Sequence, residues 1–223
     1  MSKPKLQARL AALSFSDKIK ILEKLRDREK AIAAVGLRRE SQADAPNASV
    51  KAFCRTVRQR SRTNKAAMHL LDREALTGKV VGTLREELDS MIRCIYLLSI
   101  KDRQRRHHLV EQFLNGQRWP VTDARMVGLA NQLHGWAQSV YKFGCAFIHL
   151  SKYHDPNEDP FASLTSEERK QIADHLSYYH GFHMDTDTTF NDVAPILPMV
   201  FEKIAGNLEC YVRELENDSD LDG

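Results

Sequence analysis

Residues 77–100 have the sequence TGKVVGTLREELDSMIRCIYLLSI, which carries the clearest helical pattern of the chain. Its apolar residues recur at spacings of three and four, which places them on one face of a helix: Val81, Leu84, Leu88, Met91, Ile92, Ile95 and Leu98. A long helix with one apolar face buries that face against other elements. The segment is therefore predicted to be the central core helix.

Helical patterns continue on the C-terminal side of this segment. We predict a helix in RQRRHHLVEQFLNG that ends near Gly116, and a long helix capped by Thr122 that reaches about Tyr153. Thr165 and Glu168 have capping-box spacing for a helix over residues 166–180, which Gly181 ends. The last helix is expected to begin at Pro198 and to turn five apolar residues inward, namely Phe201, Ile204, Leu208, Tyr211 and Leu215.

Two more helices are predicted on the N-terminal side. One runs from Ser16 to about Val35, and the other from Val50 to Leu71. The residues between them, near 37–49, include RRESQADAPNAS and are predicted to form a linker. No alternating strand pattern of useful length is visible.

The fold class predicted from these patterns is all-α. Residues 66–216 are expected to form a bundle of four to five core helices, and residues 1–65 an additional basic helical segment. Residues 217–223 are expected to be an acidic, disordered tail.

Composition excludes several classes of protein. With 223 residues and 42% hydrophobic residues, the chain can bury a substantial core. No run approaches the roughly 18 apolar residues that cross a bilayer, and charges interrupt the first residues, so we expect a cytoplasmic protein without membrane contact. The four cysteines form no CxxC pair and are expected to be free thiols.

The charge of the chain is divided between its two ends. Residues 1–70 hold 17 Lys and Arg against 6 Asp and Glu, whereas residues 150–223 hold 5 against 16. The basic end could contact nucleic acid, dock on the acidic end of its own or a partner chain, or form a solvated surface. The residues that could follow a phosphate backbone lie mainly at helical spacing on one face, and they are Lys51, Arg55, Arg58, Arg62 and Lys65.

The segment Tyr141-Lys-Phe-Gly-Cys-Ala-Phe-Ile-His-Leu-Ser-Lys-Tyr-His154 is predicted to be an amphipathic helix with His149 where the apolar sequence ends. Lys142 and Lys152 flank this histidine, so together they could meet a phosphate. Histidine can exchange the protons of ribose cleavage, and a cation such as Arg85 or Arg93 can stabilise the phosphate charge. The alternative interpretation is a structural His149, with Ser151 bound to the local backbone.

The sequences TLREELDSMIRCIYLL at 83–98 and FIHLS at 147–151 resemble those of the HEPN-type helical bundles of prokaryotes. The resemblance covers about residues 77–155. It implies a dimeric, metal-independent ribonuclease of a bacterial toxin or antiviral defence system, without a cofactor. His149 would match the family's histidine, and Ser151 lies in the same motif.

This chain departs from the family pattern, in which an arginine precedes the histidine by four to six residues. Lys142 stands near the place of that arginine, and lysine lacks its bidentate fork. Arg103 and His108 form an alternative pair with the family spacing. The second functional hypothesis is a non-catalytic helical module that binds RNA, another nucleic acid or an acidic protein partner. The histidines lack the spacing of a metal site, so no metal is expected.

Overall fold

A computed structural model of the chain describes residues 45–73, 76–149, 151–155 and 157–221, together with residues 24, 26 and 27. Contacts divide the chain into two units, Met1–Ala48 and Ser49–Gly223. The helix predicted over residues 16–35 lies outside the described residues except for those three, which are helical. The first part of the predicted linker, up to residue 44, also lies outside them.

The described residues form helices and no strand, which confirms the all-α prediction. The α-helices are α3 (Ala45–Arg73), α4 (Thr77–Leu98), α5 (Arg103–Leu114), α6 (Asp123–His134), α7 (Ala137–Ile148), α8 (Ser166–His180), α9 (Phe190–Val193) and α10 (Leu197–Glu216). Short 3-10 helices are η1 (Lys152–His154), η2 (Pro160–Ser163) and η3 (Ala194–Ile196).

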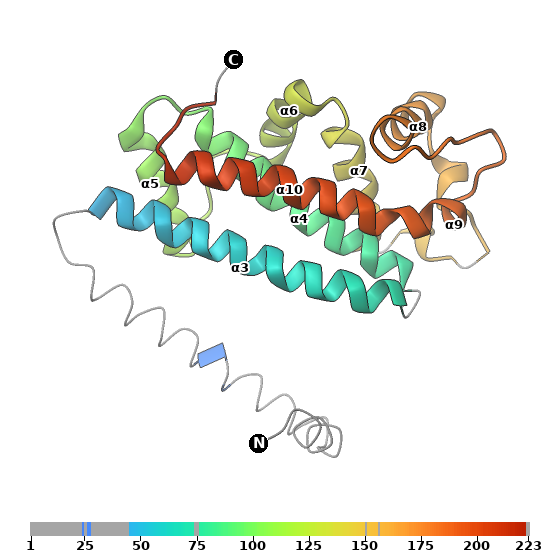
Figure 1. Ribbon diagram of the computed structural model, residues 1–223, viewed down its shortest axis with the longest axis horizontal. Helices are drawn as coiled ribbons and strands as arrows, with labels where there is room; N and C mark the ends of the chain where they lie inside the picture. Colours follow the sequence, from blue (N-terminus) through green and yellow to red (C-terminus); the bar gives the residue numbers. More distant parts are fainter. Residues whose placement is uncertain are drawn as a thin grey trace. The chain divides into compact units, whose positions relative to one another are not determined.

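Helix α4 is the centre of the bundle, as its apolar pattern predicts. Helices α10, α7, α6 and α5 pack against it, and Figure 1 shows α10 running along α4 with α6 and α7 on another side. All seven residues predicted to face the core are buried: Val81, Leu84, Leu88, Met91, Ile92, Ile95 and Leu98. Several helices pack on α4, so residues on more than one of its sides are buried, as expected of a central helix.

Helix α3 belongs to the same core. Its apolar residues Val50, Phe53, Val57 and Met68 are buried in the core cluster. The predicted boundary between residues 65 and 66 therefore falls inside a continuous helix, and the contact boundary lies between Ala48 and Ser49 instead. The end of the predicted linker, residues 45–49, is also helical. Pro46 is compatible with this because proline is tolerated in the first turn of a helix.

The long helix predicted from Thr122 to about Tyr153 is two helices in the structure. Gly135 ends α6 with a φ of 66°, a conformation that glycine adopts without strain, and α7 then begins after the buried Trp136. Helix α7 also ends earlier than predicted, at Ile148, and His149 has an extended backbone. The break turns α7 so that it packs on both α4 and α6.

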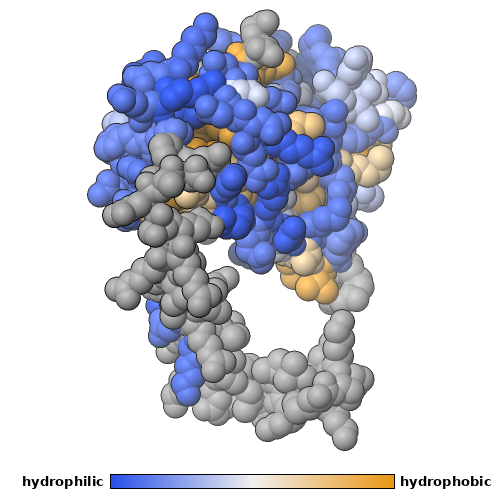
Figure 2. Space-filling model, turned by 60° about the vertical axis from the view of Figure 1, so that its left-hand side comes forward, coloured by the Kyte–Doolittle hydropathy of each residue, from blue (hydrophilic) through white to orange (hydrophobic). Residues whose placement is uncertain are grey.

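The capping signals around α8 are confirmed. The Thr165 side chain accepts from the backbone of Glu168, the Glu168 side chain accepts from the backbone of Thr165, and Gly181 ends the helix with a φ of 64°. On the surface seen in Figure 2, hydrophilic side chains prevail among the described residues, and hydrophobic ones gather in small patches. No helix among the described residues has the length and apolar character needed to span a membrane.

Candidate functional site: an arginine-lined groove

Three arginines from two helices surround one carboxylate, that of Asp89 in α4. Arg60 of α3 approaches Asp89 to 3.2 Å, Arg93 to 3.1 Å and Arg85 to 3.7 Å. Burial alone would raise the pKa of Asp89, but the hydrogen bond from Arg93 and the charges of the three arginines outweigh it and lower the pKa. Asp89 is therefore ionised at neutral pH, and it holds the three guanidinium groups together.

Two further residues close this cluster into a ring across α6 and α7. Arg93 reaches the carboxylate of Asp123 at 3.5 Å, and Asp123 accepts a hydrogen bond from the Tyr141 hydroxyl at 3.0 Å. The guanidinium of Arg85 lies over the Tyr141 ring at 3.4 Å from its centroid, a close cation–π contact. Burial raises the pKa of Tyr141 to about 12, so the hydroxyl keeps its proton and donates to Asp123.

A groove of about 320 Å³ lies beside this cluster, between α3, α4 and the connection from α5 to α6. Among the described residues that line it, Arg60, Arg93 and Arg118 stand against the carboxylate of Asp89. Outside the lining, Glu86 approaches Arg60 to 3.8 Å and Asp123 approaches Arg93 to 3.5 Å, so Arg118 carries the positive charge without a paired carboxylate among the described residues. Thr56 and Ser90 add hydroxyl groups. The aromatic walls are Phe53, Phe113 and Trp119.

The arginines of the groove keep donors for a ligand. A guanidinium carries five N–H groups, and Arg93 uses its Nε and one terminal nitrogen for the two aspartates. Arg118 is exposed, and neither an ion pair nor a hydrogen bond joins its side chain to another described residue. The groove therefore presents directed cationic donors beside an apolar wall.

The indole of Trp119 is held in place in this wall. Its Nε1 donates to the Leu109 carbonyl at 2.7 Å, and its ring stacks against Phe53 with 6.4 Å between centroids and 26° between the ring planes. Trp119 is buried and belongs to the core cluster. Arg93 extends over the same ring at 5.5 Å.

The residues predicted around His149 are not joined in the structure. His149 is exposed at the C-terminal end of α7, while Lys142 pairs with Glu168 of α8. The hydrogen bond from Lys142 is the main cause that lowers the pKa of Glu168 to about 2. Glu168 is therefore ionised and offsets the charge of Lys142. Ser151 donates to the Ala146 carbonyl at 2.6 Å, as the structural alternative expects. Among the described residues, no hydrogen bond or ion pair links His149 to any of these groups, and the Lys152 side chain lies outside the description.

Arg85 is placed away from this histidine, in the interior. Its side chain is 9% exposed, it donates to the Cys145 sulfur at 3.4 Å, and its stem packs on Gly144. It therefore fixes α7 on α4. A role for Arg85 in catalysis stays a prediction.

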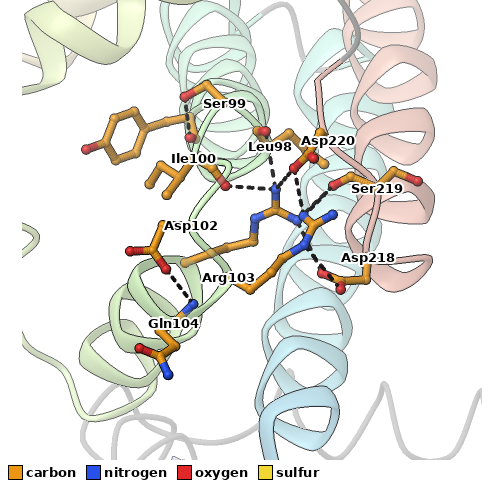
Figure 3. Close-up of polar contacts among 11 residues, drawn as sticks. Leu98, Ser99, Ile100, Asp102, Arg103, Gln104, Asp218, Ser219 and Asp220 are labelled. Carbon is orange, nitrogen blue, oxygen red and sulfur yellow. Dashed lines mark hydrogen bonds and ion pairs between the residues drawn. The ribbon is translucent and has the colours of Figure 1, made fainter.

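Arg103 and His108, the alternative pair, have different surroundings. Arg103 contacts Asp218 at 3.3 Å and Asp220 at 2.7 Å, as Figure 3 shows, whereas His108 is exposed further along α5. The buried Arg106 binds the same two aspartates. These ion pairs attach the described part of the acidic tail, residues 217–221, to α5. This part differs from the disordered tail that the sequence predicts.

The predicted basic stripe of α3 is divided in the structure. Arg58 binds Glu209 and Glu216 of α10, and Lys65 binds Glu202 at 2.7 Å. Lys51, Arg55 and Arg62 are exposed, without an ion pair to another described residue. Arg58 and Lys65 thus hold α3 on the acidic helix α10. For α3, these ion pairs agree with the interpretation that basic residues dock on the acidic end of the same chain.

Of the three arginines that line the groove, the sequence pointed only to Arg93, and it did not indicate Arg60 or Arg118. Arg85, Asp89 and Arg93 follow one another at spacings of four, which places them on one face of α4. That spacing was a signal for the cluster around Asp89. Arg60 and Arg118 come from distant segments, and only the packing of α3 and the α5–α6 connection brings them there.

Comparison with known proteins gives no relative for this chain. Neither the family models, nor the curated proteins, nor the solved structures match it. Among the described residues, no three His, Cys, Asp or Glu side chains form a group that could hold a metal ion. The function is therefore inferred from the site alone.

Proposed function

We propose that the protein binds single-stranded RNA in the arginine-lined groove, as a helical binding module without catalysis. The observation that carries the proposal is the convergence of Arg60, Arg93 and Arg118 on one groove with aromatic walls. Sites for single strands combine cationic groups that contact phosphates with flat rings that contact bases. The chemistry of the groove fits this class of ligand.

Arginine is suited to the phosphate part of this interaction. Its planar fork donates two parallel hydrogen bonds to a phosphate, which a lysine cannot do. Asp89 holds Arg60 and Arg93 in fixed positions, so little conformational entropy is lost when a phosphate binds. Arg118 has no such partner and can close over the strand.

The narrowness of the groove favours a single strand. Its volume of about 320 Å³ is suited to a small number of nucleotide units and not to a duplex. Phe113 offers the exposed part of the aromatic wall, because Phe53 and Trp119 are buried. A guanidinium plane such as that of Arg118 also stacks on an unpaired base.

Fluorescence anisotropy with a labelled RNA of about 12 nucleotides, a length within the range of single-strand sites, tests the proposal. The informative variant is Arg118→Gln, because this side chain has no partner among the described residues whose loss would disturb the fold. Its matched control is Arg105→Gln, which removes an exposed arginine of α5 outside the groove. We expect Arg118→Gln to weaken binding about tenfold, the value of one charge-assisted hydrogen bond of ~1.4 kcal/mol.

The control variant should bind like the unaltered chain. Equal losses in both variants would mean that RNA responds only to total charge, and the groove would not be the site. Absence of RNA binding by the unaltered chain at low salt would also refute the proposal.

The ribonuclease suggested by the HEPN resemblance stays a prediction, because the described contacts bring no second group to His149. The same RNA, examined on a denaturing gel without divalent metal, distinguishes the two functions. Intact RNA supports the binding module. Cleavage that His149→Ala abolishes would support the enzyme instead, and would show that a homodimer or an unseen contact completes its site.

A further inference from the structure

An apolar cavity of about 60 Å³ lies on the other side of α4, enclosed by α7, α8 and the start of α10. Its walls are mainly aliphatic and aromatic, with Leu84, Phe143, Phe190 and Val200 among them. A single water needs about 10–15 Å³ of such space, so the cavity has room for only a few non-hydrogen atoms. It is suited to a short aliphatic group.

An open groove of about 540 Å³ adjoins this cavity, between the end of α6 and one face of α8. Three residues line both spaces, and they are Trp136, Gln171 and His175. These side chains form the wall that the groove and the cavity share. A molecule in the groove therefore lies against the same side chains that line the cavity.

The shared wall contains buried polar atoms without partners. Trp136 and His175 are 5% and 7% exposed, and neither the Trp136 Nε1 nor either ring nitrogen of His175 has a hydrogen-bond partner among the described residues. Their rings lie 5.0 Å apart, between centroids. A buried donor without a partner costs about 1–3 kcal/mol, so these atoms mark a place where an acceptor would be stabilised.

A positive charge lies beside this wall. Lys203 of α10 is half-buried, its ammonium is 4.9 Å from the centroid of the Tyr179 ring, and no carboxylate of the described residues forms an ion pair with it. Burial, and then the charges of His180 and Lys203, lower the pKa of His175 to about 4. His175 is therefore neutral at pH 7 and has one N–H to donate.

Asp174 is the one carboxylate among the described residues that line the groove, and it does not offset this charge. Asp174 pairs with Lys170 at 2.8 Å, four residues earlier on α8. Lys203 does not line the groove, but its ammonium contacts the ring of Tyr179, which does. Two buried ring N–H donors in the wall and a neighbouring positive charge without an ion pair among the described residues favour an anionic acceptor.

We propose that this site binds a small carboxylate with a short aliphatic chain. The two carboxylate oxygens accept from the Trp136 and His175 N–H groups near Lys203, and the chain enters the apolar cavity. This inference is independent of RNA binding, because it uses none of the residues of the arginine-lined groove. The chemical class follows from the pairing of two donors and a cation with an apolar cavity of this size.

Isothermal titration calorimetry of the full chain with butyrate tests the inference, with butyramide and butan-1-ol as uncharged probes of similar length. We expect saturable butyrate binding at pH 7 and at least tenfold weaker binding of both uncharged probes. Trp136→Phe keeps the ring and removes its N–H, and His175→Leu removes the other donor, so each should weaken butyrate binding about tenfold. His108→Gln, an exposed histidine on α5, is the matched control and should leave the affinity unchanged.

An NMR titration of the unaltered chain keeps the test decisive if a variant does not fold. Binding at this site should shift the indole N–H resonance of Trp136 and leave that of Trp119 in place, since Trp119 already donates to Leu109. Lack of saturable butyrate binding, an unshifted Trp136 resonance, or butyramide binding as tight as butyrate would each overturn the inference.

Discussion

Gly144 allows α7 to approach Arg85 more closely than any other residue would. A Cβ built at this position would lie 2.6 Å from the Cβ of Arg85 and 3.1 Å from its Cγ. The Cβ of Arg85 is attached directly to the backbone of α4, so it cannot move away unless the helix itself shifts. The absence of a side chain at Gly144 thus sets the distance between α7 and α4.

Gly144→Ala is expected to lower the free energy of unfolding by about 1–3 kcal/mol, the usual cost of overpacking a core. Gly82→Ala is the matched control, because a Cβ there meets nothing within 4 Å and alanine favours a helix by up to ~1 kcal/mol. Urea unfolding of both variants measures the difference. Equal stability of the two variants would mean that the contact between Gly144 and Arg85 carries no constraint.

Glu87 is a buried carboxyl group of α4 that receives hydrogen bonds from two residues of α3. Ser61 and Asn64 donate to its two oxygens, the latter at 2.9 Å. Burial nevertheless raises the pKa of Glu87, and its two hydrogen bonds only reduce that shift. The folded state therefore holds this proton more strongly than the unfolded chain does.

The sign of this shift fixes a pH dependence. With the folded pKa above the unfolded value, stability due to Glu87 is present below the unfolded pKa and is lost as pH rises through the folded pKa. Glu87→Gln keeps an uncharged partner for Ser61 and Asn64, so we expect its stability relative to the unaltered chain to increase with pH over this window. Urea unfolding of both proteins from pH 4.5 to 8 measures it, and a constant difference would contradict the account.

Among the elements, α3 and α10 show how the divided charge of the sequence is used. Arg58 donates to Glu209 at 2.9 and 3.0 Å, and also to Glu216 at 2.8 Å. These contacts lower the pKa of Glu209 and raise that of Arg58. The partial burial of Arg58 makes this pairing stronger than an ordinary surface ion pair.

Arg58→Ala is expected to destabilise the fold by about 1–3 kcal/mol, because the hydrogen bonds to two carboxylates are lost. Arg55→Ala, one turn earlier on α3 at an exposed position, should change stability by less than about 0.5 kcal/mol. Thermal unfolding at low salt and at about 1 M salt compares them, and screening should reduce the Arg58 effect. A loss as large for Arg55→Ala would show that the α10 carboxylates are not the cause.

The elements also show where sequence reasoning succeeds. Helices α4 and α10 could be predicted from their apolar spacing, to which α10 adds a proline in its first turn. Helix α8 could be predicted from its capping box and from Gly181 at its end. The break at Gly135 could not, since a glycine inside a helical pattern is often tolerated and only its positive φ reveals the turn. The start of α3 was missed because Pro46 and its polar neighbours are typical of both a loop and a first helical turn.

For the whole molecule, the second unit begins where the core begins, at residue 49. Deleting residues 1–48 leaves the buried residues of this unit in place, so it should still unfold cooperatively. Deleting residues 1–65 removes Phe53, Cys54 and Val57 from the core, and we expect loss of the cooperative thermal transition. Calorimetry distinguishes these outcomes. A normal transition for the shorter chain would mean that α3 does not belong to the core.

The candidate site also depends on the whole molecule. The sequence alone predicts Arg85 and Arg93 as cations of α4, since both lie on one helix with Asp89. It does not predict that Arg60 and Arg118 line one groove with Arg93, because residues so far apart in the chain are brought together only by tertiary packing. For the same reason, the expected grouping around His149 rested on neighbours along one helix, and Lys142 instead pairs with a residue of α8.

The most direct test of RNA binding in the arginine-lined groove is to map where the RNA lies. Single-stranded RNA carrying 4-thiouridine can be cross-linked to the full chain by light, and the modified peptides identified by mass spectrometry. The account predicts cross-links at Phe113 or Arg118, and their reduction in Arg118→Gln but not in Arg105→Gln. Cross-links confined to the exposed face of α3 around Arg55 and Arg62, or to His149, would contradict it.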